Sequence, residues 1–224
     1  MFKVFEDREI LLAYYGGSRA YQNSNEKSDK DIIVILNDFD GAMHIADRET
    51  NCEYYVFGRK YYNKKMEFHK SVTPLLKIFN DDILSPLEPL ILDESYKETY
   101  LSYKNRDFKK YLKQYLNAVI EYYETFLYDG SLKKNLYHLY RIEEQVKRYL
   151  ETNEFKVELS EEVIEKIIVF KENFKSNSPE YFEELRNILN YLKAVRDNVR
   201  DWNNINSFIN TRFGKFCAFR LSCI

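Results

Sequence analysis

The 224-residue sequence contains few of the residues that mark several common protein classes. Its three cysteines, Cys52, Cys217 and Cys223, form no CxxC pair, and His44 and His69 have no partners at zinc-like spacing. We therefore expect neither a disulfide framework nor a zinc site, and a reduced, cytoplasmic protein is the simplest interpretation. Lys and Arg number 34 against 36 Asp and Glu. This balance does not predict a broad nucleic-acid-binding surface.

Long apolar runs are also absent from the sequence. No run approaches the roughly 20 residues that cross a bilayer, and residues 1–10 carry charges of both signs instead of a signal-peptide core. We expect no membrane partner. Because 45% of the residues are hydrophobic and 31% are charged, a hydrophobic core is available and global disorder is not expected.

Aromatic residues are abundant, with 20 Tyr and 16 Phe, and they follow a helical pattern in the second half. Apolar positions recur there at spacings of three and four, which predicts an amphipathic helix from about residue 106 to 128. Further helices are predicted over 132–150, from an N-cap at Ser160, and from Pro179 to about residue 202. The aromatic stripes are interpreted as core, and the lysine pair at 133–134 as a solvated helix face.

The first half has the pattern of a small sheet. Short apolar runs bounded by turn residues predict strands over 10–15, 32–36 and 52–57. Residues 60–79 are predicted to be helical, with a break near Pro74, and proline pairs over 85–89 mark a connector. We therefore predict an α+β fold.

The turn that ends the first predicted strand has the composition of a phosphate-binding loop. Gly16 and Gly17 have no side chains, so their backbone amides can approach a phosphate closely. Ser18 adds a hydroxyl group. If a helix begins at Ser18, its free N–H groups and positive dipole end point at the same anion.

Two carboxylates precede the second predicted strand. Asp29 and Asp31 are separated by one residue, so on a strand both point to the same face. Two neighbouring carboxylates repel each other unless a cation lies between them, and Mg²⁺ prefers a few carboxylates together with phosphate oxygens. The apolar run at 32–36 would hold the pair on a rigid strand.

These motifs carry a resemblance to a known superfamily. Gly-Gly-Ser followed by Asp-x-Asp before a strand resembles the signature of the DNA polymerase beta nucleotidyltransferases. Residues 17–21 (Gly-Ser-Arg-Ala-Tyr) and 28–31 (Ser-Asp-x-Asp) resemble a poorly characterised bacterial and phage branch of that superfamily. This chain has Gln22 where the branch usually has Gly. Residues 134–141 resemble a helical region of the same branch, and the likeness covers roughly residues 10–195.

The resemblance implies a fold, an activity and a set of site residues. The fold would be a polymerase beta-like mixed-sheet nucleotidyltransferase domain over 1–100, followed by a helical domain over 101–224. The superfamily adds a third carboxylate from a later strand. Glu53 is our choice because it lies in a β-rich run, and Asp47 and Glu67 are its competitors.

The implied activity is nucleotidyl transfer that depends on Mg²⁺ or Mn²⁺. Asp29, Asp31 and Glu53 would bind the metal ions, which bridge the triphosphate of an NTP, and a nucleoside monophosphate would pass to an acceptor hydroxyl. The acceptor could be RNA, protein or a small molecule, although the near-neutral charge argues mildly against long nucleic acid.

The resemblance also supplies nucleotide-binding candidates. Arg19 could contact the triphosphate, together with the Gly16–Ser18 turn. His138 and Arg141 lie at i and i+3 on one helical face, where they could meet the nucleotide or the acceptor.

Two other functions stay open on the sequence alone. The fold could serve as a binding or regulatory module, such as an antitoxin that acts on a partner protein. The Asp-x-Asp pair could also belong to a phosphatase-like hydrolase, but the first half lacks the alternating long helices that such a fold needs.

Overall fold

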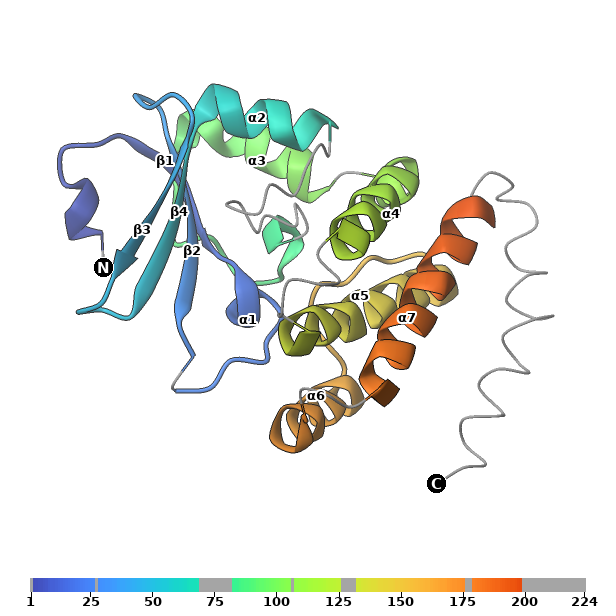
Figure 1. The fold of residues 1–224 in the computed structure, drawn as a ribbon. Coiled ribbons are helices and arrows are strands. Elements are labelled where there is room, and N and C mark those ends of the chain that lie inside the picture. Colours follow the sequence, from blue (N-terminus) through green and yellow to red (C-terminus); the bar gives the residue numbers. More distant parts are fainter. Residues whose placement is uncertain are drawn as a thin grey trace.

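The chain forms a mixed β-sheet followed by a helical part (Figure 1), so the predicted α+β class is confirmed. Strands and short helices make up the first hundred residues, with β2, β3 and β4 following one another directly, and longer helices make up most of the remainder. The computed structural model describes residues 2–26, 28–68, 82–105, 107–125, 132–175 and 179–198.

The sheet has five strands in the order β3-β4-β2-β1-β5. β2 and β4 are parallel, whereas the other neighbouring pairs are antiparallel. The three predicted strands are present, and two unpredicted strands lie at the edges. The strands are β1 (Ile10–Tyr15), β2 (Lys30–Leu36), β3 (Ala42–Asp47), β4 (Cys52–Gly58) and β5 (Ile91–Leu92).

The sequences of the two edge strands explain why neither strand was predicted. β3 has the sequence Ala-Met-His-Ile-Ala-Asp and is largely exposed, so it lacks the continuous apolar run of a buried strand. It forms by pairing along its whole length with β4. β5 has only two residues, which pair with Leu12 and Ala13. Tertiary pairing therefore decides both strands, and their local sequences do not.

The helices agree with the sequence pattern where the two can be compared. Ser160 caps α6, because its Oγ accepts a hydrogen bond from the Val163 N–H. α3 was not predicted. The predicted break near Pro74 and the predicted end near residue 202 lie outside the described residues. The helices are α1 (Gly17–Ala20), α2 (Arg59–Phe68), α3 (Lys97–Lys104), α4 (Phe108–Thr125), α5 (Leu132–Thr152), α6 (Glu161–Asn173) and α7 (Pro179–Asn198).

The two faces of the sheet are packed differently. Alternate residues of β2 serve the two faces: Ile33 and Ile35 pack with side chains of α2 and α3, whereas Ile32 and Val34 pack with Phe5 from the N-terminal segment. Alternation along β2 places residue 31 on the same face as residue 33. The Asp-x-Asp carboxylates therefore belong to the face that carries α2 and α3.

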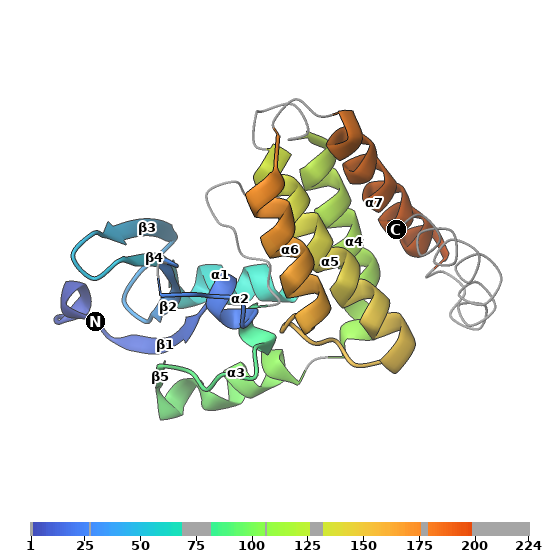
Figure 2. The same ribbon diagram turned by 90° about the horizontal axis from the view of Figure 1, so that it is seen from below.

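The long helices share a second hydrophobic core. α4, α5, α6 and α7 lie side by side in a bundle (Figure 2), and several aromatic residues of the predicted stripes, such as Phe108, Tyr115 and Tyr149, are buried in it, whereas Tyr122 and Tyr137 are half-buried. Ala20 and Tyr21, which follow the glycine turn, belong to this helical core. The turn therefore lies where the sheet and the helices meet. None of the described helices is long and apolar enough to span a membrane.

Candidate active site

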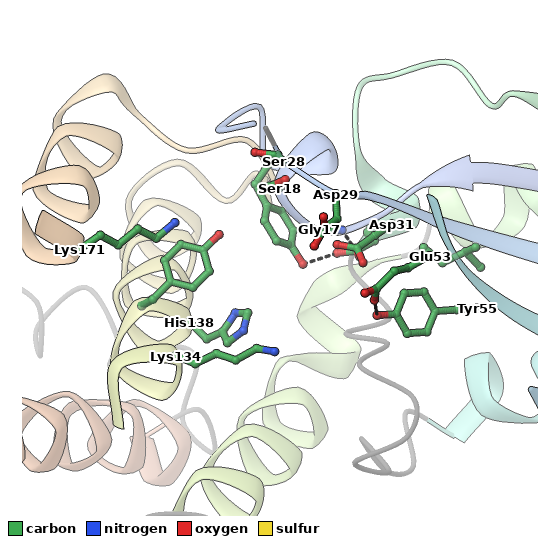
Figure 3. A pocket seen from close by; sticks show the side chains of 14 residues that line it. Gly17, Ser18, Ser28, Asp29, Asp31, Glu53, Tyr55, Lys134, His138 and Lys171 are labelled. Atoms are coloured by element: carbon green, nitrogen blue, oxygen red, sulfur yellow. Dashed lines mark hydrogen bonds between the residues drawn. The ribbon is translucent and has the colours of Figure 1, made fainter. Parts of the chain in front are cut away.

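A cavity of about 390 Å³ lies between the sheet and the helical bundle. Side chains from the glycine turn, from β2 and β4 and from α5 and α6 surround it (Figure 3). Residues that are more than a hundred positions apart in the sequence therefore meet around one space. The lining residues are Gly17, Ser18, Tyr21, Ser28, Asp29, Asp31, Ile33, Glu53, Tyr55, Asp82, Lys134, Tyr137, His138 and Lys171.

The glycine turn is held tightly against β2. The Gly16 N–H donates to the Asp31 carbonyl oxygen at 2.9 Å. Gly17 has a φ of +55°, and a Cβ atom there would come within 2.0 Å of Asp31 Oδ2. From the sequence, these glycines are predicted to let the backbone amides approach a phosphate closely. The structure adds a second reason for Gly17, because only glycine leaves room for the carboxylate beside it.

The three predicted carboxylates line the same cavity. Asp31 pairs with Glu53 in the parallel register of β2 and β4, so the two residues are direct neighbours across the strands. Asp29 precedes β2 and lines the cavity beside them. The competitor Asp47 is placed differently: its carboxylate accepts hydrogen bonds from Glu49 and Thr50 in an exposed turn. The side chain of Glu67 lies outside the described part of the chain.

Glu53 is held in place by two neighbours. The Tyr55 hydroxyl donates to Glu53 Oε2 at 3.0 Å, and His44 Nε2 lies 3.4 Å from the same oxygen. The His44 and Tyr55 rings are stacked, with centroids 4.9 Å apart. Burial, reinforced by the negative charges of Asp31 and Glu53, raises the pKa of Tyr55 well above its ordinary value. Tyr55 therefore stays protonated and remains a donor to Glu53.

A fourth carboxylate, Asp82, was not predicted. Asp82 is only 4% exposed. Its carboxylate accepts hydrogen bonds from the Gly17 N–H at 3.0 Å and from the Tyr21 hydroxyl at 2.5 Å. Asp82 begins a short 3-10 helix that follows no recognisable motif. The one available signal is an acidic residue placed directly before the apolar pair Ile83-Leu84.

These carboxylates have the chemistry that a divalent cation requires, although they do not form a complete cage. In the part of the chain that the structure describes, no three His, Cys, Asp or Glu side chains converge as ligands of one ion. Asp31 and Glu53 are neighbours, and Asp29 lines the same wall. A few carboxylates completed by phosphate oxygens are the ligand set that Mg²⁺ prefers. The residues present fit an ion whose remaining ligands are supplied by phosphate or water oxygens.

The opposite wall of the cavity is basic. Lys134 and His138 lie four residues apart on α5, and Lys171 comes from α6. Their side chains point into the space that faces the carboxylates (Figure 3). His138 was predicted at the site. Lys134 was interpreted as part of a solvated face, and that interpretation was incomplete, because this exposed residue also lines the cavity.

The two predicted arginines are not among the residues that line the cavity. The Arg19 guanidinium lies 5.5 Å from the centroid of the Tyr15 ring. Arg141 is fully buried, and its guanidinium lies 3.8 Å from the centroid of the Tyr21 ring. Tyr21 in turn donates to Asp82. Arg141 therefore contacts the site indirectly, through a cation–π contact with Tyr21.

Comparisons with known proteins give little further information. No protein-family model matches the sequence, and no curated protein matches it. Among solved structures, the chain is similar to a nucleotidyltransferase-like protein from Exiguobacterium sibiricum, at 10% identity and a TM-score of 0.31. The match covers 94% of this chain and 77% of that protein. A likeness this weak carries no argument about activity, so the function has to be argued from the cavity.

Proposed function

We propose that the protein is a metal-dependent nucleotidyltransferase that transfers a nucleoside monophosphate from an NTP to an acceptor hydroxyl and releases pyrophosphate. One observation carries the proposal: Asp29, Asp31 and Glu53 share one cavity wall with the Gly17-Ser18 turn. Carboxylates beside a tight glycine turn combine cation binding with room for a phosphate, which is what this reaction requires.

Asp29, Asp31 and Glu53 are the residues that would hold Mg²⁺ or Mn²⁺. When bound, the metal supplies charge neutralisation at the triphosphate. Asp31 is fixed against Gly17, and Glu53 is fixed by Tyr55, so neither carboxylate has to reorganise when substrate arrives. Such preorganisation is typical of sites that act by positioning and electrostatics.

The remaining steps fall to residues around the turn. Ser18 lines the cavity, and its hydroxyl would donate to a phosphate oxygen. The acceptor oxygen forms a bond to the α-phosphorus while the bond from that phosphorus to the bridging oxygen breaks, and pyrophosphate carries away the electron pair. Tyr55 and His44 both contact Oε2 of Glu53. Oε1 is therefore the Glu53 oxygen that is left to face the metal, and the proton of the acceptor hydroxyl passes to water.

The test is transfer of label from four α-³²P NTPs, with Mg²⁺ or Mn²⁺, into cell extract fractionated into RNA, protein and small molecules. We expect label with the wild-type protein and none above background with Asp29→Ala/Asp31→Ala. Asp47→Ala is the matched control, because this carboxylate lies in an exposed turn away from the cavity lining. It should label like wild type.

The labelled fraction would identify the class of acceptor. Equal labelling by wild type and the double variant, with both proteins folded, would contradict the proposal. In that case the regulatory-module alternative gains weight. It predicts in addition that ATP with Mg²⁺ does not raise the melting temperature, whereas a protein that binds the nucleotide in its native state is stabilised.

A further inference from the structure

The two walls of the cavity carry opposite charge. The sheet side presents Asp29, Asp31, Glu53 and Asp82, and the bundle side presents Lys134, His138 and Lys171. We call these three residues the basic wall. Asp29, Asp31 and Glu53 have an assigned role in the proposed function, whereas Lys134 and Lys171 have none.

Lys171 lies in a crowded cationic environment. Its Nζ is 4.2 Å from the centroid of the Tyr137 ring. Lys133 donates its Nζ to the Lys171 carbonyl oxygen at 2.7 Å and so brings a second positive charge close. Lys171 as a whole is exposed, but partial desolvation of its ammonium group and the charge of Lys133 lower its pKa. An anion placed beside this lysine would relieve both effects.

The basic wall is held at a defined position relative to the glycine turn. Asn23, in the loop that follows the turn, donates its Nδ2 to the Tyr137 hydroxyl at 3.1 Å. Tyr137 lies on α5 between Lys134 and His138, and the Lys171 ammonium group lies over its ring. The loop after the turn and the basic wall are therefore joined by a direct contact.

We propose that the basic wall is a phosphate-binding subsite. The lysines and the histidine approach one space from two helices, and several donors from different directions suit an anion with several oxygens. The phosphate would come either from the β- and γ-phosphates of the NTP or from a phosphate on the acceptor. The identity of this ligand rests on the proposed function, but the binding of the anion does not.

The first test measures the binding of pyrophosphate to the full chain in EDTA, by calorimetry. Without metal, the carboxylate wall repels the anion, so the part of the affinity that is lost with the lysines measures the contribution of the basic wall. We expect Lys134→Gln/Lys171→Gln to weaken binding at least tenfold. Lys147→Gln is the matched control, because this lysine lies on α5 and pairs with Glu143 at 2.8 Å, outside the cavity lining. It should bind like wild type.

Asp29→Asn/Asp31→Asn separates this inference from the proposed function. The variant should abolish nucleotidyl transfer and should bind metal-free pyrophosphate at least as tightly as wild type, because two negative charges are removed. If pyrophosphate does not bind, or binds equally to the double lysine variant, the subsite is wrong even where transfer is observed. If pyrophosphate binds through the lysines but no transfer occurs, the subsite stands and the proposed function fails.

Competition with ATP distinguishes the two sources of phosphate. If ATP displaces pyrophosphate from the wild-type protein, and binds more weakly to the lysine variant, the basic wall holds the triphosphate tail. If ATP and pyrophosphate bind together, the wall receives a phosphate of the acceptor. Either result supports the subsite.

Discussion

The two walls of the cavity differ in how firmly their side chains are held. On the sheet wall, short carboxylates are fixed by their surroundings: Asp31 against Gly17, Asp82 by two hydrogen bonds, and Glu53 by Tyr55. On the helical wall, Lys134 is exposed and carries its charge at the end of a long side chain. The first wall is fixed, and the second can adapt to what it binds.

This difference assigns different work to the two walls. Groups that stabilise developing charge are most effective when they are already in place, because they do not have to reorganise during the reaction. Groups that recognise a substrate can reach for it, at some loss of side-chain entropy. We expect substitutions on the sheet wall to lower kcat, and substitutions on the basic wall to raise KM.

The largest effect is expected from Asp31→Asn. The substitution keeps the size of the side chain and removes its charge, so transfer should fall by about 100- to 1,000-fold while the melting temperature stays within about 4 °C of wild type. EDTA should lower the wild-type rate to the same level. If the kinetic assay showed that Lys134→Gln/Lys171→Gln lowers kcat as much as Asp31→Asn, the two walls would not differ in the way we expect.

Three of the four carboxylates of the sheet wall could be predicted, because their signals are local. Asp29 and Asp31 lie in one short motif next to a buried run, and alternation along the strand places both on one face. Glu53 was chosen as the third carboxylate only because it lies in a β-rich run. In the structure this run is β4, which pairs with β2. The assignment of these residues to metal binding remains a prediction.

Asp82, Lys134 and Lys171 could not be predicted at the cavity, because no local pattern marks them. Asp82 reaches Gly17 and Tyr21 from 65 and 61 positions away in the sequence. Lys171 is one of several exposed lysines on amphipathic helices, and only the packing of α6 beside α5 brings it to the cavity. Single-sequence patterns describe faces of elements, whereas these residues depend on which elements meet.

The next largest effect is expected from Gly17→Ala, which tests how tightly the sheet wall is packed. The new Cβ would meet Asp31 Oδ2 at 2.0 Å and would also hold a φ of +55°, so we expect a loss of about 2 kcal/mol or more in the free energy of unfolding. Gly41→Ala is the matched control. Its φ is +103°, but a Cβ there has no neighbour within 4 Å.

Denaturant unfolding of both alanine variants separates backbone strain from steric conflict. The wall is tightly packed if Gly17→Ala loses clearly more stability and activity than Gly41→Ala. Equal losses would mean that the contact between Asp31 and Gly17 adjusts at no cost, and the contrast between a fixed and an adaptable wall would fail on its fixed side.

A smaller effect is expected from Tyr21→Phe, which acts where the two walls join. The Tyr21 hydroxyl donates to Asp82, and the Tyr21 carbonyl oxygen accepts a hydrogen bond from the Leu159 N–H. The Arg141 guanidinium lies over the Tyr21 ring. Removing its hydroxyl leaves a buried carboxylate with one donor fewer, which costs about 1–3 kcal/mol of stability. Because Asp82 also holds the Gly17 N–H, the KM for NTP should rise.

Tyr14→Phe is the control for this substitution, since it removes a buried hydroxyl that bonds Tyr62 at 2.7 Å inside the sheet core. It should lower stability and leave KM unchanged. A double-mutant cycle of Tyr21→Phe with Asp82→Asn then measures the coupling of the two residues. A cycle that is purely additive would show that Tyr21 and Asp82 act independently and that the walls are not joined through this pair.

The smallest effect is expected from Gln22→Gly, at the end of the turn. Gln22 has a φ of +58°, in the left-handed region that favours glycine, and it stands where the resembled branch usually has Gly. Glycine removes a strain of about 1 kcal/mol but makes the unfolded chain more flexible, which offsets part of that gain. We therefore expect a stability change within about 1 kcal/mol of zero and unchanged kinetics. A large loss of activity would show that the Gln22 side chain itself contributes to the site, and the turn would then differ from the rest of the sheet wall, where we propose that the backbone and the carboxylates carry the chemistry.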